Sequence, residues 1–326
     1  MTRSRAAGAS LLLLLVGSSI GAPVLTPHSP LRQFPDFENA PPMWPHLISA
    51  NGSVRRPFIR PLRMVDRLER RFAPSGIEVP ILWFRDGALW SIDETDGPWL
   101  PLGADPLGRD VFSRLLYGAR LSLSVALMAS LAALLIGVVV GGLAGFAGGR
   151  VDTALMALAD FILVLPAIFV VLSLRAAMPL VLSVSQVFWT LTLVLAASGW
   201  PVVARGVRGV VSAERRKEYA EAAKSVGASP WRILQRHLLP ATTGLLLSLE
   251  TMMVPAFVVA EGTLTLVGLG FPVPAASWGS MLRDAWQGSA FTDAPWLLAP
   301  AGALALTVLA MQLLGSTAPQ TVEPSK

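Results

Sequence analysis

Residue types that perform catalysis are sparse in this 326-residue chain. Cysteine is absent, which excludes a thiol nucleophile, a thiolate metal site and a disulfide framework. The three histidines, His28, His46 and His237, are isolated from one another, and no HExxH or GxSxG arrangement falls in a plausible pocket. No GxxxxGKS/T phosphate-binding pattern occurs. We therefore expect no catalytic site, no metal and no cofactor on this chain.

Three carboxylates in or beside apolar runs are the remaining candidates for chemistry. Asp160 lies within one apolar run, Glu250 lies in the middle of another, and Glu261 lies at the end of that second run. Inserting an ionisable group at the centre of a membrane helix costs roughly 2.5–3.5 kcal/mol of free energy on insertion scales. Such a group is therefore a functional candidate by default. We favour a structural role, such as capping or bonding between helices, for Asp160 and Glu261 over contact with a substrate. Both roles stay open for Glu250.

The most distinctive polar stretch is residues 212–240, SAERRKEYAEAAKSVGASPWRILQRHLLP, which lies between two long apolar runs. It predicts a helix, a turn and a second helix. Ser212 is the expected N-cap of the first helix, and Gly227 suits the left-handed position that ends it. Ser229 and Pro230 then supply an N-cap and a first-turn proline for the second helix. Four apolar residues at i, i+3, i+4 and i+7 give the first helix one narrow face: Tyr219, Ala222, Ala223 and Val226.

The face of this first helix is built of small residues beside Glu218 and Glu221. Small side chains allow close approach, and the carboxylates favour a basic partner, so the stretch is suited to docking against a groove on another protein. From the residues alone, an ordinary solvated amphipathic hairpin is the alternative interpretation.

The spacing of Glu221-Ala222-Ala223, Gly227 and Leu239-Pro240 resembles the EAA loop of bacterial ABC-transporter permeases. The RHLLP sequence ending at Pro240 is similar to the RHILP of the dipeptide and oligopeptide branch. A second match, from Asp105 to Arg120, resembles the segment that precedes the second span in peptide-type permeases. The resemblance covers roughly residues 103–314. It implies that the first helix of the loop sits in a cleft of a cytoplasmic ATPase subunit, with these coupling residues: Glu218, Glu221, Ala222, Ala223, Gly227 and Pro240.

The same resemblance implies the partners of the chain. It predicts a permease subunit of an importer of the dipeptide, oligopeptide or nickel type, and not an enzyme. The expected partners are a second, homologous permease, two ABC ATPase subunits, an extracytoplasmic substrate-binding protein and membrane lipid. ATP and magnesium would be bound by the ATPase. The chain itself would form half of a translocation path for peptides or a similar small solute.

Composition supports a polytopic membrane protein, because 53% of the residues are hydrophobic, 14% are charged and the mean hydropathy is +0.58. Binding to nucleic acid is not suggested. Backbone groups in lipid must be paired internally, so we expect an all-α fold with six transmembrane helices. The spans are predicted near residues 6–25, 121–146, 153–174, 187–204, 238–260 and 296–314. Gly137, Gly141, Gly142 and Gly145 repeat along the second span and should permit close helix packing.

The predicted organisation has four parts. Residues 1–25 form an N-terminal transmembrane anchor, 26–117 an extracytoplasmic segment, 118–316 a five-span core and 317–326 a cytoplasmic tail. Basic residues concentrate in the 212–240 loop, which places that loop in the cytoplasm. With six spans, both termini are expected to be cytoplasmic as well. The expected location is the cytoplasmic (inner) membrane of a bacterium. Within the extracytoplasmic segment, residues 64–72 are expected to form a short helix, and residues 79–92 a hairpin around Gly87.

Two other classes of protein compete with this interpretation. A secondary transporter or channel would use Asp160, Glu250 and Glu261 as an ion relay without ATP. A membrane-anchored enzyme or binding module would use residues 26–117, but that segment offers no catalytic constellation and only a small core. Dependence of transport on an ATPase partner separates the first alternative from the importer.

Overall fold

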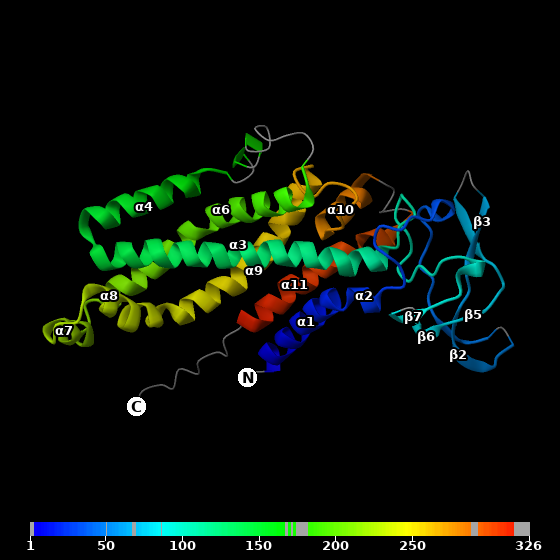
Figure 1. Ribbon diagram of the computed structural model, residues 1–326, viewed down its shortest axis with the longest axis horizontal. Coiled ribbons are helices and arrows are strands. Elements are labelled where there is room, and N and C mark those ends of the chain that lie inside the picture. Colours follow the sequence, from blue (N-terminus) through cyan, green and yellow to red (C-terminus); the bar gives the residue numbers. More distant parts are fainter. Residues whose placement is uncertain are drawn as a thin grey trace, which may run out of the picture. The chain divides into compact units, whose positions relative to one another are not determined.

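The computed structural model describes residues 3–49, 51–66, 70–85, 87–166, 169–170, 172–173, 182–287 and 293–315 (Figure 1). Its α-helices are α1 (Arg3–Ile20), α2 (Ala22–Leu25), α3 (Val111–Ala147), α4 (Gly149–Val164), α6 (Val184–Glu214), α7 (Glu218–Ser225), α8 (Pro230–Ile233), α9 (Thr243–Leu266), α10 (Trp278–Gln287) and α11 (Ala299–Gly315). A π-helix, η3 (Leu234–Leu238), and a 3-10 helix, η4 (Leu239–Thr242), join α8 to α9. Other 3-10 turns are η1 (Pro35–Phe37), η2 (Glu94–Asp96) and η5 (Pro295–Leu298).

Four helical stretches are long and apolar enough to cross a membrane, judged by length and composition over the described residues. They are Val111–Ala147, Val184–Glu214, Pro230–Leu266 and Pro295–Gly315. The other two predicted spans correspond to α1 and α4, which have 18 and 16 residues. The helix α4 ends at Val164, just before Pro166, and several residues in the second half of the third predicted span lie outside the described residues. The predicted 317–326 tail also lies outside them.

The chain divides into two compact units, which we describe separately. The first comprises residues 1–10, 123–261 and 308–326, and the second comprises residues 11–122 and 262–307. In the first unit, the glycines of α3 lie directly against α6. A Cβ atom at Gly137 or Gly141 would collide with Val203 or with the carbonyl of Ala204, and one at Gly145 would lie 2.7 Å from the Arg208 carbonyl oxygen. The predicted close packing along this glycine stripe is confirmed.

The second unit contains a small β-rich segment between α2 and α3. Its strands are β1 (His46–Ile48), β2 (Val54–Ile59), β3 (Leu62–Asp66), β4 (Arg71–Pro74), β5 (Val79–Pro80), β6 (Leu82–Arg85) and β7 (Ala88–Ser91). They form an antiparallel sheet in the order β1-β2-β5 and two hairpins, β3-β4 and β6-β7. The fold is therefore mostly helical, and the expectation of an all-α chain is wrong for this segment.

A compact core holds this segment together. Buried residues include Ile59, Trp99 and Leu100, and the Trp99 indole nitrogen donates a 3.0 Å hydrogen bond to the carbonyl oxygen of Met43. The hairpin predicted around Gly87 is confirmed as β6-β7, with Trp83 paired to Trp90.

The short helix expected at residues 64–72 is wrong, because its two ends form the hairpin β3-β4. Phe72 stacks on Phe37 with ring centroids 6.2 Å apart, and Leu62 packs against the same core. A short isolated helix is marginal in water, whereas in the hairpin both side chains are half-buried against this core.

A buried ion network fixes the second sequence match, around Asp105, to α10. The guanidinium Nε of Arg109 lies 2.7 Å from Asp105 Oδ2, and Arg109 Nη2 lies 2.9 Å from Asp284 Oδ2. Arg114 is paired with both carboxylates as well. Asp110 lies beside this network and caps the start of α3 by accepting hydrogen bonds from the backbone N–H groups of Phe112 and Ser113.

Candidate functional site

The corner that precedes the 212–240 loop differs from the sequence prediction. Ser212 lies inside α6, which continues to Glu214, so the N-cap predicted at Ser212 is wrong. The next helix, α7, begins at Glu218 after an N-cap at Lys217. Glu214 accepts hydrogen bonds from Lys217 Nζ at 2.7 Å and from the Tyr219 hydroxyl at 2.6 Å, which ties α7 to the end of α6. This hydrogen bond from Tyr219 to Glu214 raises the pKa of Tyr219 to about 12.

The turn between the two short helices follows the sequence prediction. Gly227 has a φ of 82°, in the left-handed region that glycine adopts without strain. The Ser229 hydroxyl accepts a 3.3 Å hydrogen bond from the backbone N–H of Arg232, and Pro230 stands in the first turn of α8. The segment from α7 to α8 is hereafter the hairpin, residues 218–233.

The apolar face predicted for the first helix is turned away from the rest of the chain. Val226 is 87% exposed, and Tyr219 and Ala222 are exposed as well. The buried residue of α7 is instead Ala220, which sequence reasoning did not single out. Trp231, at the start of α8, is also exposed and was not singled out. The hairpin therefore presents apolar side chains next to Glu218 and Glu221, both of which are exposed.

The base of the hairpin is anchored in the first unit. Ile233, Leu234 and Leu238 are buried, and a Cβ at Gly142 of α3 would lie 3.3 Å from Leu239 Cδ2. Pro240 lies in η4, where its carbonyl oxygen accepts a 2.7 Å hydrogen bond from the Thr243 hydroxyl. The exposed tip is thus carried on a packed base, which η3 and η4 connect to α9.

A groove of about 880 Å³ lies behind the hairpin, between α7, α8 and the adjoining ends of α3, α4 and α6. Arg208 Nε donates a 2.9 Å hydrogen bond to Asp152 Oδ1 on its wall. Arg215 donates to the Phe146 carbonyl and lies 5.5 Å from the centre of the Phe146 ring. Figure 1 shows α7 and α8 beyond the end of α6, close to the turn from α3 to α4.

The three candidate carboxylates have different surroundings. Asp160 is exposed and forms an ion pair with Arg205 of α6. Glu250 is half-buried and accepts a 2.7 Å hydrogen bond from the hydroxyl of Ser130 on α3. Glu261 is fully buried near the end of α9. Neither Ser130 nor Arg205 was predicted as a partner of these carboxylates, because nothing local connects them to groups 120 and 45 positions away.

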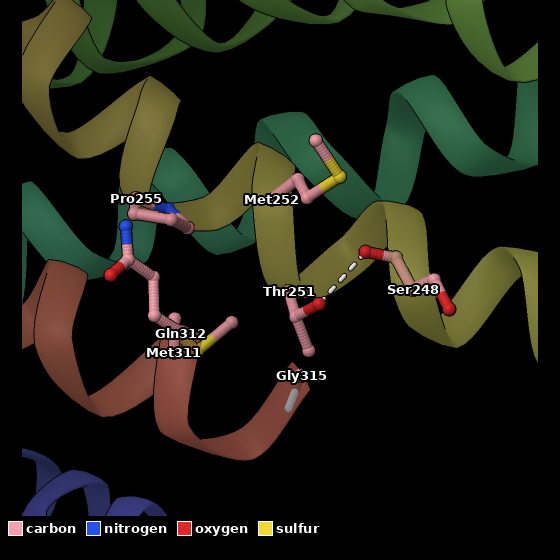
Figure 2. Close-up of a pocket in the computed structure, with 7 residues that line it drawn as sticks. All are labelled: Ser248, Thr251, Met252, Pro255, Met311, Gln312 and Gly315. Atoms are coloured by element: carbon pink, nitrogen blue, oxygen red, sulfur yellow. Dashed lines mark hydrogen bonds between the residues drawn. The ribbon is translucent and has the colours of Figure 1, made fainter. Parts of the chain in front are cut away.

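A second cavity, of about 440 Å³, lies between α9 and α11 in the first unit (Figure 2). Its lining combines hydroxyl, amide and thioether groups from Ser248, Thr251, Met252, Pro255, Met311, Gln312 and Gly315. The Thr251 hydroxyl donates to the Ser248 carbonyl oxygen at 2.8 Å, as Figure 2 shows. Glu250 does not line this cavity, because at 100° per residue its position falls on the opposite side of α9 from Ser248 and Met252.

Comparison with known proteins identifies relatives over most of the chain. A model of the family described as "Binding-protein-dependent transport system inner membrane component" matches residues 137–323, which include the hairpin. The dipeptide transport system permease protein DppC of Bacillus subtilis (strain 168) is 33% identical over 320 residues, covering 98% of this chain and 81% of that protein. The oligopeptide transport system permease protein OppC of the same organism is 36% identical over 68% of this chain and 70% of that protein. The glutathione transport system permease protein GsiD of Pectobacterium atrosepticum is 34% identical over 68% of this chain and 72% of that protein.

A solved structure supports the fold. The MetNI methionine ABC transporter, in an inward-facing conformation, aligns with a TM-score of 0.51 at 19% identity, covering 63% of this chain and 94% of that one. The family match and the sequence relatives, together with apolar helices of membrane length, define the chain as a transport permease. The chain belongs to the family of inner membrane components of binding-protein-dependent transport systems, the permease subunits of ABC importers.

Proposed function

We propose that this chain is the permease of an importer for peptides, in which it forms half of the translocation path. The substrate class rests on the relatives, whose names refer to dipeptide, oligopeptide and glutathione transport. Selection among such solutes would lie largely in a separate substrate-binding protein. The other half of the path is supplied by a second, homologous permease.

The observation that carries the coupling proposal is the exposed apolar tip of the hairpin. Val226, Tyr219 and Trp231 are uncovered, while Ile233 and Leu234 bury the base. Apolar side chains gathered on one exposed surface are typical of a site where another protein binds. We assign the tip to a cleft on an ATPase subunit, with six coupling residues: Glu218, Glu221, Ala222, Ala223, Gly227 and Pro240. The two carboxylates, exposed beside the tip, would meet basic side chains of that cleft.

The assembly that follows has two permeases, two ATPase subunits that bind ATP and magnesium, and an extracytoplasmic binding protein. Closure of the ATPases on ATP would press the hairpin and move α9 through the buried base around Leu238. The hairpin and both termini would be cytoplasmic, with residues 26–117 outside and six helices crossing the membrane.

The carboxylates receive different roles in this proposal. Asp160 is assigned a structural role because its ion pair with Arg205 joins α4 to α6. Glu261 is assigned a structural role because it is fully buried. Glu250 is the candidate for a contact with the translocation path, because its Oε2 atom is buried and has no hydrogen-bond partner among the described residues.

Reconstitution tests the proposal against ion-driven transport. The chain would be co-expressed with its ATPases and second permease, placed in liposomes and assayed for uptake of a labelled dipeptide with the binding protein outside. We expect uptake to need ATP and the binding protein, and to persist when ionophores collapse the proton and sodium gradients. If uptake occurs without the ATPases and ionophores abolish it, the chain would instead be a secondary transporter that uses intramembrane carboxylates.

A further inference from the structure

The hairpin β6-β7 of the second unit carries exposed aromatic side chains next to helix ends. Trp83 is 50% exposed and Phe84 is 80% exposed. Phe84 also has a φ of 56°, a backbone conformation that bulky residues rarely adopt. The two neighbours on the strand are therefore both uncovered, although successive side chains of a regular strand face opposite sides.

Contacts within the second unit hold the β6-β7 hairpin beside the ends of two apolar helices. Trp90, paired across the hairpin with Trp83, donates its indole N–H to the carbonyl oxygen of Leu25 at 2.8 Å. Its ring also lies 6.5 Å from that of Phe112 in the first turn of α3. The β6-β7 hairpin thus lies beside the last residue of α2 and the first turn of α3, a helix that is long and apolar enough to span a membrane. Figure 1 shows β7 next to α2.

Apolar side chains are also exposed on the helices that precede the β6-β7 hairpin. Four apolar side chains of α1 and α2 in the second unit are exposed: Leu13, Leu14, Ile20 and Val24. In an inner membrane component, such a row is suited to contact with lipid. Arg120 donates hydrogen bonds to the carbonyl oxygens of Ser19 and Ile20. A charged group therefore lies at the end of α1, where a helix in contact with lipid would reach water.

We propose that Trp83 and Phe84 lie in the interfacial layer of the lipid bilayer and anchor the β-rich segment to the membrane surface. Aromatic residues concentrate in this layer, because their rings are apolar while an indole N–H can bond to headgroups or water. The hydrogen bond of Trp90 to the Leu25 carbonyl oxygen ties the β6-β7 hairpin to α2, so this hairpin would lie at the membrane surface near the end of α1. A lipid surface also accounts for two exposed aromatics at the hairpin that borders the helix ends.

The absence of cysteine from the chain makes a direct test possible. Single-cysteine variants Phe84→Cys and Trp83→Cys of the full chain would be labelled with an environment-sensitive fluorophore. Each would be reconstituted in vesicles of phosphatidylcholine and phosphatidylglycerol. Quenching by lipids that carry a nitroxide high in the acyl chain would then be compared with quenching by aqueous iodide. Val54→Cys is the matched control, since Val54 is also an apolar strand residue and is 79% exposed.

We expect the probes at positions 83 and 84 to be quenched several-fold more by nitroxide lipid than the probe at 54, and several-fold less by iodide. A probe at 84 that iodide reaches as readily as the probe at 54 would overturn the proposal. Probes shielded from both quenchers would also overturn it, since they would show that a protein surface covers the aromatics. If one variant fails to elute as a folded species, the other position decides.

Discussion

Ser130 on α3 donates a 2.7 Å hydrogen bond to Oε1 of Glu250 on α9, while the Oε2 atom of the same carboxylate is buried without a partner among the described residues. This bond joins two helices that each belong to a candidate span. One half of the Glu250 carboxylate is therefore held in place, and the other half is available to a further donor.

Ser130→Ala should destabilise the chain, because it removes the donor and leaves both carboxylate oxygens unpaired at a cost of about 1–3 kcal/mol. Ser248→Ala is the matched control, since the Ser248 hydroxyl donates to the Gly244 carbonyl oxygen of its own helix and its loss should change stability by less than about 0.5 kcal/mol. Thermal unfolding of the purified variants in detergent measures both. Equal melting temperatures for the two variants would contradict the expected contribution of the bond between helices.

Glu250→Ala should leave assembly with the partner subunits intact, because it removes the buried carboxylate together with the need to pair it. Transport then identifies its role. Loss of peptide uptake by an intact complex would indicate that the carboxylate contacts the translocation path. Unchanged uptake with a more stable complex would indicate a tolerated structural group. Failure of the complex to assemble would contradict the prediction.

Asp105→Ala should destabilise the second unit strongly. Asp105 pairs with Arg109 and Arg114, and its removal leaves buried guanidinium groups undercompensated, which typically costs about 3–5 kcal/mol. The exposed pair of Glu38 with Arg70 is the control, and Glu38→Ala should cost no more than about 1 kcal/mol. Chemical denaturation followed by fluorescence compares them, and similar losses in both variants would show that the buried network is not needed for stability.

Several of these features could be foreseen from the sequence. Gly227, Ser229 and Pro230 carry strong local preferences, so the turn and the start of α8 form as their residue types predict. The glycine repeat on α3 likewise implied close packing, although the sequence could not identify α6 as the neighbour. Local chemistry was sufficient where a single residue type determines backbone geometry.

Other features depend on residues far apart in the chain. The network of Arg109 needs Asp284, which lies 175 positions away, and nothing near Arg109 indicates it. The predicted N-cap at Ser212 failed because α6 continues to Glu214, whose carboxylate binds Lys217 and Tyr219 instead. A residue that suits a cap can also lie within a helix when its surroundings favour continuation.

Asp110 should make stability depend on pH. Its burial raises the pKa of the carboxyl from an ordinary value of 3.8 to about 7, although hydrogen bonds from Ser113 and Phe112 oppose the rise. A raised carboxyl pKa means that the folded state binds the proton more tightly, so this group's stabilising contribution falls as pH rises from about 4 to about 7. Asp110→Asn keeps an acceptor for the cap and should remove that decline. Parallel curves of melting temperature against pH for the two proteins would contradict the prediction.

The proposed orientation predicts which side of the membrane two exposed positions face. In the cysteine-free chain, Thr95→Cys should react with an impermeant thiol reagent in intact cells, whereas Ser225→Cys should react only after the cells are permeabilised. Both side chains are exposed in the structure, so a failure to react reports the membrane barrier rather than burial. The opposite pattern would reverse the topology and remove the hairpin from the cytoplasm.

Gly227→Val should uncouple transport from ATP hydrolysis while the helices still insert. The φ of 82° at Gly227 is one that a β-branched residue adopts only with strain of order 1–3 kcal/mol, and this strain should tilt α7 or loosen the turn that holds its exposed tip. No neighbouring atom lies within 4 Å of a Cβ built at this position, so the effect would come from the backbone rather than from a collision.

The matched control is Gly209→Val, because Gly209 also has open space around it but lies within α6 without a positive φ. Both variants should reach the membrane at near-normal levels, since neither changes the apolar runs that drive insertion. Co-purification of the ATPase subunit and substrate-stimulated ATP hydrolysis in the reconstituted complex would be measured for each. The control should retain both properties, and Gly227→Val should lose stimulation or binding. If Gly227→Val matched the control in both assays, the hairpin would not be the coupling element.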